Sequence, residues 1–132
     1  MGQPAAKQGD KVVATDTHIV MVPQGPALVP TPLPHPFSGM LTGGLSSDVK
    51  IMGMAAAVVG STADNVPPHV PAATPGTFQR PPTNKATIQA GSQTVKINGK
   101  PAARTGDKAL TCNDPSDLPA GTVTATGTVM IG

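Results

Sequence analysis

Three histidines and one cysteine are the residues of this chain best suited to hold a metal ion: His18, His35, His69 and Cys112. Imidazole nitrogen and thiolate sulfur are the ligands that Zn²⁺ prefers, and four protein ligands make a closed, structural site. No two of these residues have the local spacing of a zinc finger. Taken singly, a histidine among prolines is more often a solvated surface residue, and a lone cysteine is more often a small buried hydrophobe. As a set, the four residues predict one structural Zn²⁺ per chain.

An internal repeat supports the prediction of a shared site. Residues 4–10 read Pro-Ala-Ala-Lys-Gln-Gly-Asp and residues 101–107 read Pro-Ala-Ala-Arg-Thr-Gly-Asp. A weaker copy covers residues 55–61, and the three copies are almost evenly spaced. His18, His69 and Cys112 follow the three copies in turn, by 8, 8 and 5 residues. The shared motif positions are Pro4, Ala5, Ala6, Gly9 and Asp10 in the first copy, and Pro101, Ala102, Ala103, Arg104, Gly106 and Asp107 in the last.

The composition indicates a thin core. Gly (15) and Pro (16) are abundant, whereas the only aromatic residues besides histidine are two phenylalanines. A chain with so little large apolar surface is disordered, or fibrous and β-rich with a thin core, or stabilised by something other than its core. A structural zinc can supply roughly 10–16 kcal/mol of apparent binding free energy in small zinc peptides. The low charged fraction and the patterned segments count against disorder, which stays an alternative together with an adhesive repeat.

Several classes of protein are excluded or disfavoured. A single cysteine allows no intramolecular disulfide framework. We find neither a signal peptide nor an apolar run long enough to span a membrane, so we expect synthesis and assembly in the cytoplasm. The net charge of +2 is small, and the charges are scattered without aromatic platforms. Nucleic-acid binding is therefore not expected.

The periodicity predicts an all-β chain without helices. Alternation over residues 87–97 predicts two strands joined at Gly91-Ser92, and Asn98-Gly99 predicts a type I′ turn. Residues 122–131 alternate as one strand, and residues 12–14 and 18–22 are also strand-like. The Pro-rich stretches 23–36 and 67–82 predict rigid, extended loops. Three β units with thin apolar faces favour a three-sided prism over residues 1–132, read as a single domain.

The two strong motif copies closely resemble the motif that names the PAAR-repeat proteins, and the resemblance extends over the whole chain. The middle copy departs from the motif because it lacks the proline, the basic residue and the aspartate. The resemblance implies a conical β-prism of three pseudo-threefold-related small sheets. It also implies a Zn²⁺ near the apex, held by three histidines and one cysteine, which correspond to His18, His35, His69 and Cys112.

The resemblance further implies a function without catalysis. A PAAR-type protein caps and sharpens the trimeric β-helical spike of a contractile injection machine, as in type VI secretion systems and phage-tail-like particles. We therefore expect a monomer that binds one spike trimer, touches the target membrane transiently, leaves with the particle, and offers attachment to effectors. No toxin extension is expected.

A metal-dependent hydrolase acting on the target envelope is the alternative. It would need an open metal position and a general base. The chain has no glutamate, and Asp10 and Asp107 belong to repeat turns.

Overall fold

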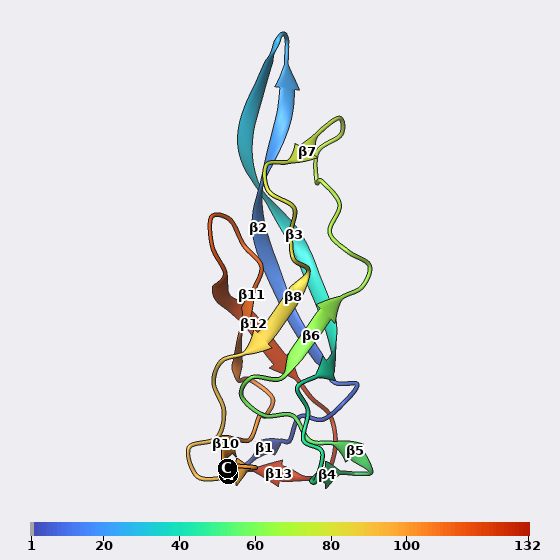
Figure 1. Ribbon diagram of the computed structural model, residues 1–132, viewed down its shortest axis with the longest axis vertical. Coiled ribbons are helices and arrows are strands. Elements are labelled where there is room, and N and C mark those ends of the chain that lie inside the picture. Colours follow the sequence, from blue (N-terminus) through green and yellow to red (C-terminus); the bar gives the residue numbers. More distant parts are fainter. Residues whose placement is uncertain (1) are drawn as a thin grey trace.

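The computed structural model describes residues 2–132, which form a long, tapering body whose regular secondary structure consists of β-strands (Figure 1). Within those residues no helix is present, so none could cross a membrane. The all-β prediction is confirmed. The strands are β1 (Gln3–Pro4), β2 (Lys11–Gln24), β3 (Ala27–Gly43), β4 (Lys50–Ile51), β5 (Met54–Ala55), β6 (Thr62–Asn65), β7 (Thr77–Phe78), β8 (Lys85–Ile88), β9 (Lys96–Ile97), β10 (Lys100–Pro101), β11 (Lys108–Thr111), β12 (Leu118–Thr124) and β13 (Met130–Ile131).

The middle of the body is a closed antiparallel sheet. Its strand order is β12-β11-β8-β6-β3-β2-β7, and β12 also pairs with β2. Six strands therefore form a ring, to which β7 adds one short pairing higher on β2 at Val20 and Met21. Closure leaves the six-stranded ring without an exposed edge at the level where β12 meets β2.

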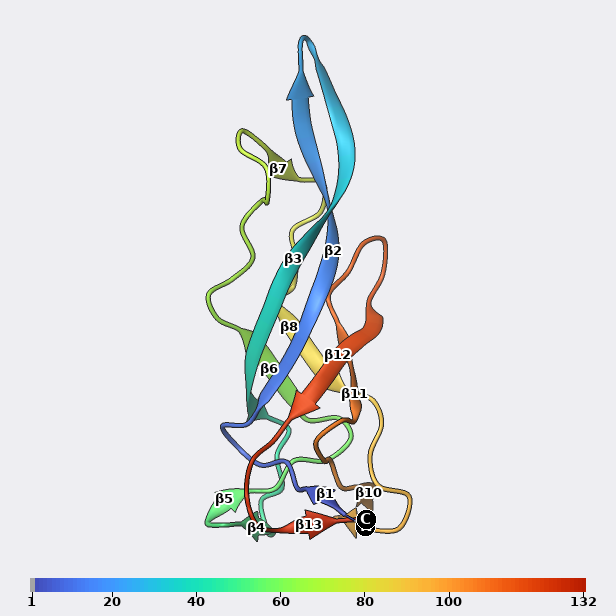
Figure 2. The same cartoon turned by 180° about the vertical axis from the view of Figure 1, so that it is seen from behind.

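Three two-stranded sheets form the wide base: β4–β5, β9–β10 and β13–β1 (Figures 1 and 2). The first two are tight hairpins whose turns have positive φ at both central residues, Met52-Gly53 and Asn98-Gly99. This is the signature of the type I′ turn, as the sequence predicts for Asn98-Gly99. The third sheet pairs Gln3 with Ile131, so segments from opposite ends of the sequence complete the base.

The repeat motifs join the base to the ring through cyclic backbone hydrogen bonds. The amide of Ala6 donates to the carbonyl of Ala103 (2.9 Å), Ala103 donates to Ala57 (3.0 Å), and Ala57 donates back to Ala6 (3.0 Å). All three alanines are fully buried. Three backbones converge here, so only a small side chain fits. This explains why alanine is common to all three motif copies.

The end of each motif is a turn held by its last side chain. Asp10 Oδ2 accepts from the amide of Lys7 (3.0 Å), and Asp107 Oδ2 accepts from the amide of Arg104 (2.8 Å). In the middle copy Ser61 Oγ accepts from the amide of Val58 (3.0 Å). The preceding glycines, Gly9, Gly60 and Gly106, have φ of 91°, 98° and 91°, a conformation that glycine adopts without strain. The divergent middle copy thus makes the same turn with a different acceptor.

The core is as thin as the composition indicates. The main buried cluster consists mostly of alanine and valine, with Phe37, Leu41 and Ile88 as its largest members. A second cluster lies at the base and contains Ile51, Ile97 and Ile131. Each of these isoleucines is the last residue of its strand, which is β4, β9 or β13. The three residues therefore occupy equivalent positions in the three base sheets.

The prediction of an extended loop over residues 23–36 is wrong, because this stretch belongs to a long hairpin. β2 and β3 pair without interruption from Lys11↔Met40 to Gln24↔Ala27. The prolines do not break β3, because Pro30, Pro32 and Pro34 all lie at positions that need no hydrogen bond to β2. The opposite residues show this: the amides of Ile19 and Thr17 point away from β3, toward Asp114 and Asn113.

Two further strand predictions are corrected. Ile88 and Val95 do not face each other across a turn, since β8 pairs with β6 and β11 whereas β9 pairs with β10. Residues 122–131 form two separate strands, because the chain leaves the ring after Thr124 and enters the base at Met130. Ile88, Ile97, Val123 and Ile131 are buried, as the alternation predicts, but against partners distant in the sequence, whereas Val129 is exposed. Of the second Pro-rich stretch, 67–82, only β7 is a strand.

Candidate metal centre

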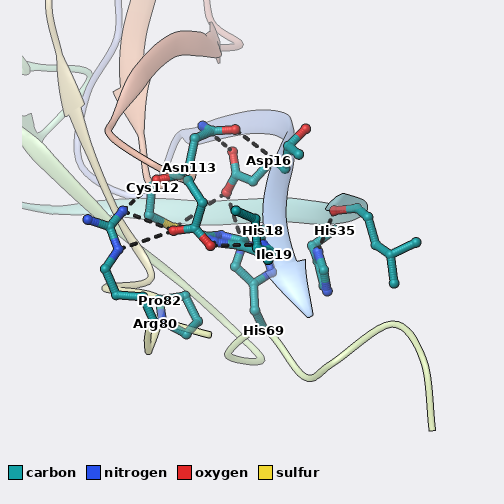
Figure 3. Close-up of polar contacts among 12 residues, drawn as sticks. Asp16, His18, Ile19, His35, His69, Arg80, Pro82, Cys112 and Asn113 are labelled. Atoms are coloured by element: carbon teal, nitrogen blue, oxygen red, sulfur yellow. Dashed lines mark hydrogen bonds and ion pairs between the residues drawn. The ribbon is translucent and has the colours of Figure 1, made fainter. Parts of the chain in front are cut away.

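The three histidines and the cysteine converge above the closed sheet (Figure 3). His18 lies on β2, His35 on β3, His69 in the segment after β6, and Cys112 directly after β11. The ring centroids are 5.0 Å apart for His18 and His69, 5.5 Å for His18 and His35, and 5.6 Å for His35 and His69. Residues separated by up to 94 positions in the sequence (18 to 112) therefore share one small volume.

Four side chains offer ligand atoms that all lie within 4.8 Å of one another: Asp16, His18, His69 and Cys112. Asp16 is not among the residues that the sequence analysis selects. Its signal is nevertheless present, because Asp16 and His18 are two residues apart on a strand and so point to the same face. This cluster could hold a metal ion.

Asp16 is a fully buried carboxylate with several hydrogen-bond partners. Its Oδ2 lies 2.9 Å from His69 Nε2 and 3.5 Å from Cys112 Sγ. Its Oδ1 accepts from Thr111 Oγ1 (2.5 Å) and from Asn113 Nδ2 (3.4 Å). A buried carboxylate is costly unless it is paired or hydrogen-bonded. The carboxylate of Asp16 therefore lies among the possible metal ligands, and its negative charge would complement a cation bound there.

His18 is the member of the cluster whose polar atoms most need a partner. Both ring nitrogens are buried, and neither makes a hydrogen bond. The carboxylate of Asp114 is 3.6 Å from Nδ1. Burial lowers the pKa of His18, although the Asp114 charge opposes this shift. Its imidazole is therefore held in the neutral form that binds metals, and a buried nitrogen without a partner is costly. Coordination of a metal would remove that cost.

His35 lies in the same triangle of rings, but both its nitrogens have protein partners. Nδ1 is 2.9 Å from the carbonyl of Leu33, to which it donates, and Nε2 accepts from the amide of Ala72 (3.1 Å). Burial lowers the pKa of His35, against the opposing effect of the Leu33 hydrogen bond. As a metal ligand, Nε2 would have to exchange the Ala72 amide for the ion. The role of His35 as a ligand stays a prediction.

Cys112 is a buried free thiol. Burial, together with the neighbouring Asp16 charge, raises its pKa to about 11. Without a cation the sulfur therefore keeps its proton at neutral pH. A bound metal supplies the positive charge that stabilises a thiolate. Imidazole nitrogens with one thiolate are a donor set that suits Zn²⁺.

Residues around the cluster fix the backbone that presents it. Asp114 accepts from the amide of Ile19 (2.8 Å) and pairs with Arg80 (2.9 Å). Burial by itself would raise the Asp114 pKa, but these hydrogen bonds outweigh it and lower the pKa. Asn113 Oδ1 accepts from the amide of Thr17 (2.7 Å), so the segment after β11 holds β2 on both sides of His18. The sequence offered no signal for these contacts, because they join segments about 95 residues apart.

His69 is held by a pair of asparagines. Its amide donates to Asn84 Oδ1 (2.8 Å), and its Nδ1 lies 3.3 Å from Asn65 Nδ2. Asn84 has a positive φ of 58°, a conformation that asparagine tolerates better than most residues. The irregular segment that carries His69 is thus fixed where the closed six-stranded sheet lies next to the cluster.

Comparison with known proteins identifies one family. The family model described as PAAR motif matches residues 34–115 and again residues 79–132. The two matches overlap and together include the middle and last repeat copies, His35, His69 and Cys112. No curated protein matches the chain.

Proposed function

The chain belongs to the PAAR-motif family, and we propose that it forms the non-enzymatic tip of the central spike of a contractile injection machine. The observation that carries this proposal is the cyclic arrangement of the three motifs. A single chain presents three pseudo-equivalent units around one axis, with hydrogen bonds running from each unit to the next. One copy therefore matches the symmetry of a threefold partner.

The base is the surface that we assign to the spike. It carries the three two-stranded sheets and lies at the end opposite the tapering hairpin (Figure 1). Several large apolar side chains are exposed there, namely Val49, Met52, Met54, Val129 and Met130. Exposed apolar groups gathered on one face are typical of a protein interface. A trimeric β-helical spike is the partner that the family implies.

We further propose that Zn²⁺ occupies the metal centre. His18, His69 and Cys112 would hold it, with His35 as the fourth ligand and Asp16 as the competing candidate. The bound ion would supply no catalysis, only a cross-link between segments that each follow one of the three motif copies. Closing such long loops stabilises a chain with a thin core.

Metal binding by this set is tested by competition with a chromophoric chelator. We expect about one zinc per chain and a marked loss of affinity for His35→Ala. The Asp16→Asn variant keeps the size of the side chain and should lose less. A larger loss for Asp16→Asn than for His35→Ala would replace His35 by Asp16 in the ligand set.

A metal-dependent hydrolase is the second candidate, favoured by one observation. A hollow beside the cluster is lined by His18 and Cys112, and Asp117 lies on its wall. The other carboxylates nearby, Asp16 and Asp114, are already engaged by several donors. We therefore expect no turnover of peptidoglycan, lipid or peptide substrates. Reproducible turnover that Asp117→Asn abolishes would establish the hydrolase instead.

The spike-tip proposal itself is tested by stoichiometry. The chain is co-purified with the trimeric spike protein of its own machine, and the complex is weighed by light scattering. We expect one tip per spike trimer and a monomeric tip in isolation. Three tips per trimer would contradict the proposal, as would failure to bind the spike. Effector attachment and release with the particle are further parts of the proposal, to be tested on the assembled complex.

A further inference from the structure

The most distinctive feature outside the metal centre is the end of the β2–β3 hairpin. Beyond β7, residues 22–30 project alone from the body, and the turn at Gly25-Pro26 is the extreme point (Figures 1 and 2). Gly25 has a φ of 60° at the first central position of this two-residue turn, as a type II′ turn requires. Residues 23–30 are all exposed. Three related sheets form the base, but only the first motif copy is followed by such a long hairpin.

The end of the hairpin carries no charged side chain. Between Asp16 and Asp48 the sequence contains no Asp, Glu, Lys or Arg, and none occurs between Asp64 and Arg80, the stretch that includes β7. Apart from Gln24, the exposed side chains near the turn are apolar or proline, with Leu28 59% and Val29 36% exposed. Gln24 is the single exposed polar side chain of residues 22–30. A surface of this kind loses little by leaving water.

Prolines also remove the hydrogen-bond donors from the outer edge of the hairpin. The even-numbered residues of β3 direct their amide positions away from β2, and proline occupies four of them: Pro30, Pro32, Pro34 and Pro36. On β2, Pro23 occupies the outward position nearest the turn. Lower on that edge the amides of Thr17 and Ile19 are already bonded to Asn113 and Asp114. Of the outward positions of β3 near the turn, Leu28 is not a proline, so it keeps a backbone amide, which points away from β2.

This pattern argues against a protein partner that adds a strand to the hairpin. Strand addition needs a row of free amides and carbonyls on the edge, and proline at alternate positions deletes the amides. The same deletion favours a lipid environment, in which an unsatisfied donor is costly. The outward carbonyls remain, so a hairpin that inserts unaided should stay near the headgroup region.

We propose that the end of this hairpin, residues 22–30, is a lipid-contact element that inserts into the surface of an electrically neutral bilayer. The inference rests on the proposed function only for its biological setting, since the hairpin lies opposite the base that we assign to the spike. These residues would meet the membrane first, and they are separate from the metal centre below. Because the element is uncharged, its binding should not require anionic lipid.

The absence of Trp and Tyr gives a direct test. Leu28→Trp places one fluorophore beside the turn, and Met130→Trp places one on the base as the matched control. Both proteins are mixed with phosphatidylcholine vesicles that contain lipids with quenchers at known depths. We expect a blue shift and shallow quenching for Leu28→Trp, and unchanged emission for Met130→Trp. Unchanged emission of Leu28→Trp, or an equal shift of both reporters, overturns the proposal.

A second set of variants makes the test independent of the reporter. Leu28→Asp combined with Val29→Asp adds charge at exposed positions, so the fold should be kept, as a thermal melt can check. We expect partitioning into the same vesicles to fall by about tenfold or more. Val66→Asp, at a residue 73% exposed on the side of the body, should have no effect. Equal partitioning of the double variant and the unchanged chain overturns the proposal. Spike stoichiometry does not depend on these residues, so either proposal can fail alone.

Discussion

The base and the apex of this molecule are held together in different ways. At the base three copies of one motif exchange backbone hydrogen bonds in a closed cycle, and three buried alanines allow the close approach. Toward the apex the units are no longer equivalent. β2 and β3 have 14 and 17 residues, whereas β6, β8 and β11 have four residues each.

The metal centre lies where this equivalence ends. His18, His69 and Cys112 each come from the segment that follows one motif copy, so the cluster joins three segments that share no regular strand pairing there. A repeat can specify its own contacts only while the copies stay alike. Above that level the three segments are joined by contacts of individual side chains. These are the candidate ligands, the buried Asp16 beside His69, and the asparagine that holds the backbone of His69.

The largest expected effect is loss of the metal at the apex. Cys112→Ala removes the thiolate, and we expect the free energy of unfolding to fall by more than about 4 kcal/mol in zinc-loaded protein. The measurement is chemical denaturation with and without a strong chelator. After chelation the variant and the unchanged chain should have nearly equal stability. A variant that stays much less stable after chelation would show that the sulfur acts through packing instead.

The next effect concerns the base and does not involve the metal. Ala103→Leu introduces a larger side chain where three backbones meet, and we expect a destabilisation of about 3 kcal/mol from overpacking. Ala27→Leu, at an exposed position of the apical hairpin, is the matched control and should change stability little. Zinc affinity should be preserved in any folded fraction of Ala103→Leu, as chelator competition can measure.

The smallest expected effect tests the divergent middle motif. Ser61 is buried, accepts from the amide of Val58 and donates to the carbonyl of Gly44. Ser61→Ala leaves that buried amide without its acceptor, and we expect a loss of about 2 kcal/mol in thermal or chemical denaturation. Ser47→Ala, at an exposed site, serves as the control. A neutral Ser61→Ala would mean that the middle motif does not need its turn acceptor.

The base was more predictable from the sequence than the apex, for a physical reason. The motif copies and the Asn98-Gly99 turn depend on local residues, so the pattern indicates them. The hairpin was missed because Pro30, Pro32 and Pro34 look like strand breakers until the pairing register shows that their missing amides face outward. Asp16 was missed because its role depends on burial beside His69 and Cys112, which lie far away in the sequence.

Hydrogen exchange measured residue by residue tests most directly whether the metal holds the apex while the motifs hold the base. The amides of Ala6, Ala57 and Ala103 report on the base, and those of Thr17 and Ile19, bonded to Asn113 and Asp114, report on the apex. On removal of zinc we expect exchange to become much faster at Thr17 and Ile19 and to change little at the three alanines. Equal acceleration at both ends, or none at Thr17 and Ile19, would contradict this account.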